Sequence, residues 1–304
     1  MNIILFHYEH IVGGAQTLSL RIFRWGSKNG YDLYWVKTKT GFEEVELIEE
    51  LEKLNVKIIR IKSLKNSCNF SIYNKKLLYS GNTIVITYNV KEYYLSKILV
   101  RSRKGNINYL LYVIHPYIVY EPSANGNRLY KCMHYVKYNI LHKYAILKME
   151  KRHEIHYMDE ITLKQGEYYY HIKANKENII RLGVDIVEFN EEIVKKRLKN
   201  DVFTIISVSR ISFPFKAYLK ALVKEVEDRN FHNKRTKLII IGYGENEDEL
   251  KKIINSMKCS KNYIEYMGKC DYKQVLNLFA QANLNIGMGT TVLDAASTGL
   301  PTLI

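Results

Sequence analysis

Short apolar runs that alternate with helical patterns constrain the fold of this 304-residue chain more than any other feature. In the first part of the chain, the runs that predict strands are residues 2–6, 33–37, 56–61, 83–87, 109–114, 154–158 and 178–181. The helical patterns there are residues 18–25, 43–54, 91–100 and 127–152. This alternation is typical of βαβ units, which build a parallel sheet.

The same alternation restarts at residue 203 and predicts a second domain. Its predicted strands are residues 203–208, 237–241, 264–267, 284–286 and 302–304, and its predicted helices are residues 217–228, 247–257 and 272–281. We therefore predict an α/β protein with two doubly wound parallel-sheet domains that face each other, residues 1–185 and residues 186–304, with a connector at 185–201. In such sheets, ligands bind at the carboxyl ends of the strands.

The net charge of +15 is spread unevenly along the chain. Residues 201–304 hold 14 basic and 11 acidic side chains, which leaves +12 of the total on residues 1–200. Such a field attracts phosphate groups in nucleic acid, in anionic lipid or on a phosphorylated acceptor. No nucleic-acid-binding module is recognisable, so we do not expect a nucleic acid partner.

The cysteines and the hydropathy indicate a reduced, cytoplasmic protein. The four cysteines are far apart and form no CxxC pair, which argues against a metal site or a disulfide framework; they are Cys68, Cys132, Cys259 and Cys270. No apolar run approaches the ~18 residues that span a bilayer. Any membrane association is therefore expected to be peripheral.

Two glycine turns follow predicted strands. Gly13 and Gly14 precede Gln16 at the start of a helix, where glycine lets the backbone approach an anion and the helix terminus favours negative charge. Gly242 and Gly244 follow the strand 237–241 and permit a similar approach. Each turn is also compatible with an ordinary βα connection that binds nothing.

Two cations follow the predicted strand 203–208. Arg210 and Lys216 stand six positions apart at the exit of this strand, where a pyrophosphate group would bind. Arginine offers a forked set of donors and lysine a mobile point charge. The alternative is a pair of surface cations on a loop.

A glycine-rich segment after the strand 284–286 leads into a short helix. We expect this helix to open at Thr290 or Thr291, after Gly289, and to end at Gly299. Threonine hydroxyls and helix N–H groups suit phosphate oxygens. Asp294, one turn into the helix, can accept hydrogen bonds from ribose hydroxyls, or it is a solvated acid without a ligand.

Together these motifs resemble glycosyltransferase family 4, whose members are retaining enzymes with the GT-B fold. The sequence Gly13-Gly14-Ala15-Gln16 resembles the glycine loop of the family's first domain. Residues 178–185 resemble the segment before the interdomain connector, with Leu182 where asparagine is usual.

The resemblance also suggests roles for individual residues. Arg210 and Lys216 match the family's donor-diphosphate pair in type and spacing, and Asp294 takes the place of its ribose-binding glutamate. His115, at the end of a predicted strand and followed by Pro116, resembles the family's active-site histidine near the transferring sugar.

Two features depart from the family pattern. The earlier glutamate of the family signature should stand eight positions before Asp294, where this chain has Ile286. The resemblance also stops at Ile304, directly after a predicted strand, whereas relatives continue through further helices. We therefore expect a C-terminally truncated second domain with apolar surface exposed near Leu303 and Ile304.

The resemblance implies an enzyme of the hexosyltransferase class. It would move a hexose-type sugar from a nucleotide-diphosphate sugar, with retention and without a metal, to a cell-surface polysaccharide or lipid-linked acceptor, as in capsule or lipopolysaccharide biosynthesis. No DxD-like carboxylate pair follows a strand. The alternative is a catalytically silent GT-B-like protein that acts as a partner or binding subunit.

The predicted helix 127–152 suggests a further partner. One apolar stripe runs along it through Leu129, Met133, Val136, Ile140, Tyr144 and Leu147, and seven basic residues lie among and around it. A basic, Tyr-rich amphipathic helix can lie in an anionic membrane interface, here the inner face of the cell membrane. The alternative is a helix that packs its stripe on the sheet.

Overall fold

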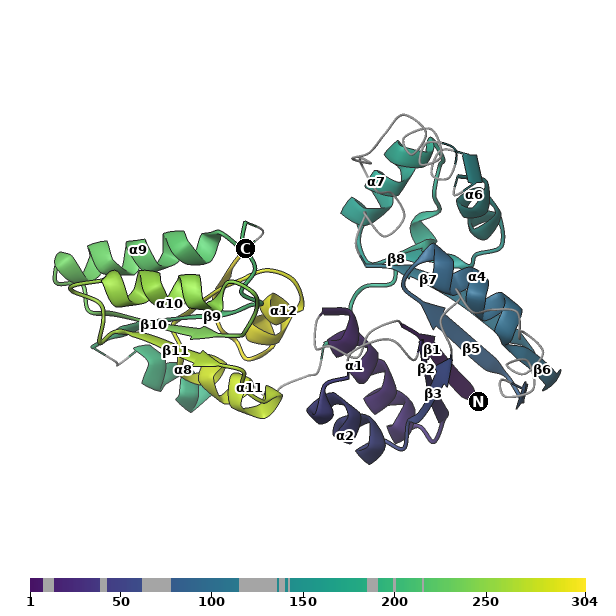
Figure 1. Cartoon of the computed structure of the whole chain (residues 1–304), viewed down its shortest axis with the longest axis horizontal. Helices are drawn as coiled ribbons and strands as arrows, with labels where there is room; N and C mark the ends of the chain where they lie inside the picture. Colours follow the sequence, from purple (N-terminus) through teal and green to yellow (C-terminus); the bar gives the residue numbers. More distant parts are fainter. Residues whose placement is uncertain are drawn as a thin grey trace. The chain divides into compact units, whose positions relative to one another are not determined.

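The computed structural model describes residues 1–7, 14–38, 43–61, 78–114, 136, 140–141, 143–184, 191–198, 201–214 and 216–304. The chain divides into two compact units, Met1–Gly183 and Val184–Ile304, and each unit is a parallel sheet covered by helices (Figure 1). Within the described ranges, no helix is both long and apolar enough to cross a membrane.

The sheet of the first unit has six parallel strands in the order β3-β2-β1-β5-β7-β8. These strands are β1 (Asn2–Phe6), β2 (Asp32–Thr38), β3 (Lys57–Ile61), β5 (Thr83–Thr87), β7 (Ile107–Val113) and β8 (Ile155–Tyr157). A separate parallel pair consists of β4 (Leu78–Ser80) and β6 (Arg101–Lys104). The helices are α1 (Gly14–Lys28), α2 (Val45–Lys53), α4 (Val90–Leu99), α6 (Lys143–Lys151), α7 (Glu160–Tyr170) and the 3-10 helix η4 (Lys176–Asn178).

Both faces of this sheet are buried, because successive side chains of a strand point to opposite faces. In β1, Ile3 and Leu5 pack with residues of α1 and α2, whereas Ile4 and Phe6 pack with residues of α4. Burial on both faces explains why the strands appear in the sequence as continuous apolar runs.

The sheet of the second unit has five parallel strands in the order β11-β10-β9-β12-β13. These strands are β9 (Phe203–Val208), β10 (Thr236–Ile241), β11 (Ile264–Gly268), β12 (Leu284–Ile286) and β13 (Thr302–Leu303). The helices are α8 (Glu191–Leu198), α9 (Tyr218–Phe231), α10 (Glu247–Ser256), α11 (Tyr272–Gln281) and α12 (Thr290–Ser297). Residues of α9 and α10 pack on one face of the sheet, and residues of α11 and α12 pack on the other (Figure 1).

Several sequence predictions need correction. The segment 178–181 is not a strand, because η4 takes its first residue and only a single bridge joins Ile179 to Tyr157. The connector contains the helix α8, and α7, β4 and β6 were not predicted. The apolar stripe of 127–152 does not face the sheet in its described part: Tyr144 and Leu147 are exposed, and Ala145, Ile146 and Met149 are buried instead.

Each sheet has a point at which the chain changes direction. In the first unit the chain moves from β1 to β2 and β3, and then continues on the other side of β1 with β5, β7 and β8. In the second unit the chain moves from β9 to β10 and β11, and then continues on the other side of β9 with β12 and β13. Open α/β sheets bind ligands outside the carboxyl ends of the strands at such a switch point.

Candidate functional site

The switch point of the second unit joins the end of β9 to the start of α12. The hydroxyl of Thr291 lies 3.2 Å from the carbonyl oxygen of Val208, the last residue of β9, and 3.2 Å from that of Met288. The helix begins at Thr290, as predicted, after Gly289 with a φ of 78°, and no side-chain cap is found for it in the described chain. The N–H groups of its first turn therefore suit an anion.

Gly242 and Gly244 bring the exit of β10 against the exit of β9. A Cβ atom on Gly242, whose φ is 139°, would lie 1.8 Å from the carbonyl oxygen of Ser209. A Cβ atom on Gly244 would lie 2.3 Å from the carbonyl oxygen of Ile211. The backbone N–H of Ile211 donates a hydrogen bond to the carbonyl oxygen of Tyr243 at 3.0 Å. Backbone packing alone thus requires both glycines, whether or not a ligand approaches them.

Arg210 follows β9 and is largely exposed. Its guanidinium lies 3.4 Å from a carboxylate oxygen of Glu245, and the other oxygen of that carboxylate accepts a hydrogen bond from Ser212 at 2.6 Å. The Ser212 hydroxyl is the main reason that the pKa of Glu245 is lowered. An exposed pair of this kind contributes little to stability, so Arg210 can exchange Glu245 for another anion.

Lys216 and Asp294 are less exposed than Arg210. Lys216 is half-buried, and burial lowers the pKa of its ammonium group. Asp294 is buried and accepts a hydrogen bond from the hydroxyl of Tyr272 at 3.1 Å, so it is not a solvated acid. Ile286 packs against the core beneath α9 and α10.

In the first unit, the described part of the predicted site is small. Gly13 and His115 lie outside the described residues. Gly14 opens α1, and a Cβ atom there would meet nothing within 4 Å. Gln16 is buried, and its amide nitrogen lies 2.8 Å from Nε2 of His7.

Sequence reasoning missed His7, together with its second partner, Glu92. His7 directly follows β1, and Glu92 lies in the first turn of α4, which follows β5. Their positions after the two strands at the switch point were the available signal, but the order of the strands was needed to interpret it.

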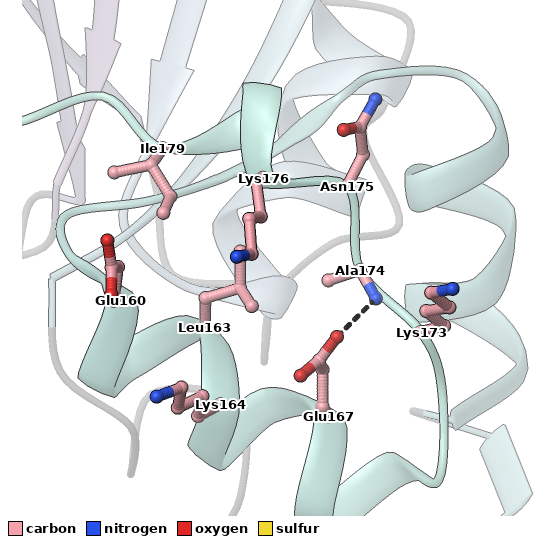
Figure 2. Close-up of a pocket in the computed structure, with 9 residues that line it drawn as sticks. All are labelled: Glu160, Leu163, Lys164, Glu167, Lys173, Ala174, Asn175, Lys176 and Ile179. Carbon is pink, nitrogen blue, oxygen red and sulfur yellow. Dashed lines mark hydrogen bonds between the residues drawn. The ribbon is translucent and has the colours of Figure 1, made fainter.

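A separate hollow of about 550 Å³ lies beside α7. Figure 2 shows its lining side chains, with the carboxylate of Glu167 accepting a hydrogen bond from the backbone N–H of Ala174 at 2.9 Å. The lining residues are Glu160, Leu163, Lys164, Glu167, Lys173, Ala174, Asn175, Lys176 and Ile179. None of the predicted site residues is among them.

Two parallel-sheet units, each with such a switch point, are the components of the GT-B class of fold, and comparison with known proteins supports this assignment. Residues 188–304 match the family model described as glycosyl transferases group 1. Among curated proteins, no sequence matches the chain.

Solved structures resemble the whole chain. HepE of Anabaena, solved with UDP and glucose, is 13% identical with a TM-score of 0.63 over 99% of this chain and 80% of its own. A TarM variant of S. aureus, solved with fondaparinux, alpha-GlcNAc-glycerol and UDP, is 10% identical with a TM-score of 0.63 over 99% and 85%. WaaG, a glycosyltransferase involved in lipopolysaccharide biosynthesis, is 12% identical with a TM-score of 0.60 over 99% and 80%.

At these identities the structural likeness shows the fold, which is that of the GT-B glycosyltransferases with two Rossmann-like domains. The match of residues 188–304 to the family of glycosyl transferases group 1 supports a transferase enzyme.

Proposed function

We propose that this protein is a retaining glycosyltransferase of family 4 that transfers a hexose-type sugar from a nucleotide-diphosphate sugar to a cell-surface polysaccharide or lipid-linked acceptor. The observation that carries the proposal is the switch point of the second unit, where Arg210, Lys216 and the start of α12 follow neighbouring strands. In the described part of the chain, the start of α12 has no side-chain cap. Two of the similar structures contain UDP, and one relative is involved in lipopolysaccharide biosynthesis.

In the proposed reaction, the developing negative charge of the leaving diphosphate is neutralised by donors that are already in place. Arg210 leaves Glu245 and binds the diphosphate, Lys216 adds a second positive charge, and the N–H groups at Thr290 and Thr291 bind phosphate oxygens. Electrostatic stabilisation of this kind is often the largest single contribution to catalysis. We propose that Asp294 binds the ribose, that His115 contacts the transferring sugar, and that no metal takes part.

The proposal predicts that Arg210→Ala weakens the binding of a nucleoside diphosphate. The expected loss is about 1–3 kcal/mol, because one charge-assisted hydrogen-bonding group is removed. Calorimetric titration with UDP, GDP and ADP measures it. Lys237→Ala is the matched control, since Lys237 pairs with Glu265 at the amino-terminal end of the same sheet. Equal affinities in the wild type and Arg210→Ala would contradict the assignment.

The second candidate function is that of a catalytically silent partner subunit. The observation that favours it is Ile286, which is partly buried and packs against the core where the family signature has a carboxylate. Nucleotide binding without sugar transfer or donor hydrolysis would support this alternative. Turnover of a UDP- or GDP-sugar would support the enzyme.

We further propose that the first unit contacts an anionic membrane at the cytoplasmic face. The described members of the predicted apolar stripe are all exposed: Val136 by 41%, Ile140 by 55%, Tyr144 by 68% and Leu147 by 36%. Tyr94 of α4 is exposed by 46% as well, and the pKa of its hydroxyl is raised, mainly by partial burial and to a smaller extent by Tyr144. Exposed apolar side chains among lysines are typical of an interfacial surface.

This surface predicts a charge-dependent affinity for vesicles. Replacing the exposed Lys148 and Lys151 by Glu should weaken binding to phosphatidylglycerol vesicles at least about tenfold, since each basic residue near an anionic surface contributes about 1 kcal/mol. Sedimentation with vesicles at low and high salt measures it. Replacing the exposed Lys224 and Lys252 by Glu is the control, because it makes the same charge change in the second unit. Binding that is insensitive to salt and to both variants would refute the proposal.

A further inference from the structure

A chain of three polar side chains occupies the switch point of the first unit. His7 follows β1, Glu92 lies in the first turn of α4 after β5, and Gln16 lies in the first turn of α1. β1 and β5 are the neighbouring strands between which the chain changes direction. The general rule for open α/β sheets therefore places a ligand next to these side chains.

The hydrogen bonds among these side chains indicate which ring nitrogen of His7 carries the proton. Nδ1 of His7 lies 3.4 Å from Oε1 of Glu92, and Oε2 of Glu92 accepts a hydrogen bond from the N–H of Tyr88 at 3.3 Å. A carboxylate only accepts hydrogen bonds, so Nδ1 carries the proton. Nε2 lies 2.8 Å from the amide nitrogen of Gln16, which donates to it. In this arrangement Nε2 is a hydrogen-bond acceptor.

Glu92 lies where its carboxylate can stabilise the His7 tautomer with the proton on Nδ1. The residue is 1% exposed, and burying a carboxylate costs free energy unless it is paired. A buried carboxylate on Nδ1–H of a histidine fixes the orientation and the tautomer of the ring, as it does in catalytic triads. The His7 side chain remains 17% exposed, and its ring packs edge-on against Tyr88 with the centroids 5.5 Å apart.

We propose that His7 is an acceptor-binding residue, whose Nε2 exchanges the Gln16 amide for a hydroxyl group of the sugar acceptor. This inference rests on the proposed glycosyltransferase function. The ligand class follows from the state of the ring: an Nε2 lone pair binds a donor such as a sugar hydroxyl, whereas a phosphate needs an N–H and is repelled by Glu92. Glu92 is a positioning residue that acts through His7.

Long-range ¹H–¹⁵N NMR of the imidazole rings tests the first part of the proposal without any ligand. The His7 signals are assigned by their loss in His7→Ala. We expect the Nδ1–H tautomer in the wild type and a mixture of tautomers in Glu92→Gln, which keeps the size of the side chain but removes the charge. An Nε2–H tautomer in the wild type would overturn the proposal.

Titration with methyl β-D-glucopyranoside, and in parallel with inorganic phosphate, tests the ligand class. The glucoside should shift the Nε2 signal of His7 and phosphate should not. Its affinity should fall about tenfold in His7→Ala and about threefold or more in Glu92→Gln, in line with the loss of one hydrogen bond. Ser19→Ala, which removes the 2.9 Å contact with Tyr88 in the same core, should leave the affinity unchanged.

Two results would overturn the proposal: a His7 signal that does not move with the glucoside, and one that moves with phosphate. UDP affinity in the same samples separates this test from the proposed function. His7→Ala should bind UDP as the wild type does, because the proposed donor site lies in the second unit. A wild type that does not bind UDP would count against the donor site, while the NMR experiment would still decide the role of His7.

Discussion

Replacing Arg197 by alanine is expected to destabilise the second unit by about 3–5 kcal/mol. Arg197 lies on α8, is 5% exposed, and donates to three backbone carbonyl oxygens at the ends of α11 and α12. The distances are 2.5 Å to Ala280, 3.2 Å to Thr298 and 3.2 Å to Gly299. Alanine would leave these partly buried carbonyl groups without the donor that now satisfies them.

The positions of the two tryptophans allow the unfolding of the two units to be followed separately in this experiment. Trp25 and Trp35, the chain's only tryptophans, both belong to the first unit. In urea unfolding, tryptophan fluorescence therefore reports on the first unit and far-ultraviolet circular dichroism on both. Arg197→Ala should shift the circular dichroism transition and leave the fluorescence transition in place.

Lys195→Ala is the matched control for Arg197→Ala. Lys195 lies on the same helix, and its only described ion pair is the exposed one with Glu191 at 3.3 Å. Such a pair contributes at most about 0.5 kcal/mol. Equal effects of the two substitutions would show that α8 does not anchor the second unit.

Gly242→Ala is expected to cost about 3 kcal/mol or more and to abolish nucleotide binding. The new methyl group would lie 1.8 Å from the carbonyl oxygen of Ser209, and a φ of 139° is strained for any residue with a Cβ atom. The clash is with backbone, so relief requires the exit of β9 to move. Arg210 directly follows Ser209 in the sequence and would move with the exit of β9.

Gly287→Ala separates this effect from a general intolerance of alanine. A Cβ atom on Gly287 would lie 3.6 Å from its nearest neighbours, which is ordinary contact. Hydrogen exchange should show faster exchange at the ends of β9 and β10 in Gly242→Ala and little change in Gly287→Ala. Similar exchange in the two variants would mean that the exits of β9 and β10 tolerate a side chain.

The sequence predicted the second unit's elements closely because their signals are local. The bounds of β9, β12 and α11 coincide with the predicted ranges. The strand β9 is a mainly apolar run, and Asp271 caps α11 by accepting from the N–H of Gln274. The start of α12 at Thr290 is one of the two positions, Thr290 and Thr291, that were predicted from the glycines before it.

Other elements carried weaker local signals. Asp159 caps α7 by accepting from the N–H of Thr162, but the helix was missed because its apolar pattern is mixed with tyrosines and charges. On α6 the longest apolar stripe is exposed, and the smaller Ala145 contributes to the buried face instead. Periodicity indicates that a helix has an apolar side, but not which side the rest of the protein covers.

The sequence by itself determined the class of fold and the residues that follow the strands, among them Arg210 and Lys216. Only the tertiary structure decided that Glu92 meets His7, 85 positions away, and that Arg197 serves the carbonyl groups of α11 and α12. The physical reason is that strand and helix formation depends on neighbouring residues. The partner of a buried polar group depends instead on the order in which parallel strands assemble, and that order is fixed by the packing of the whole sheet.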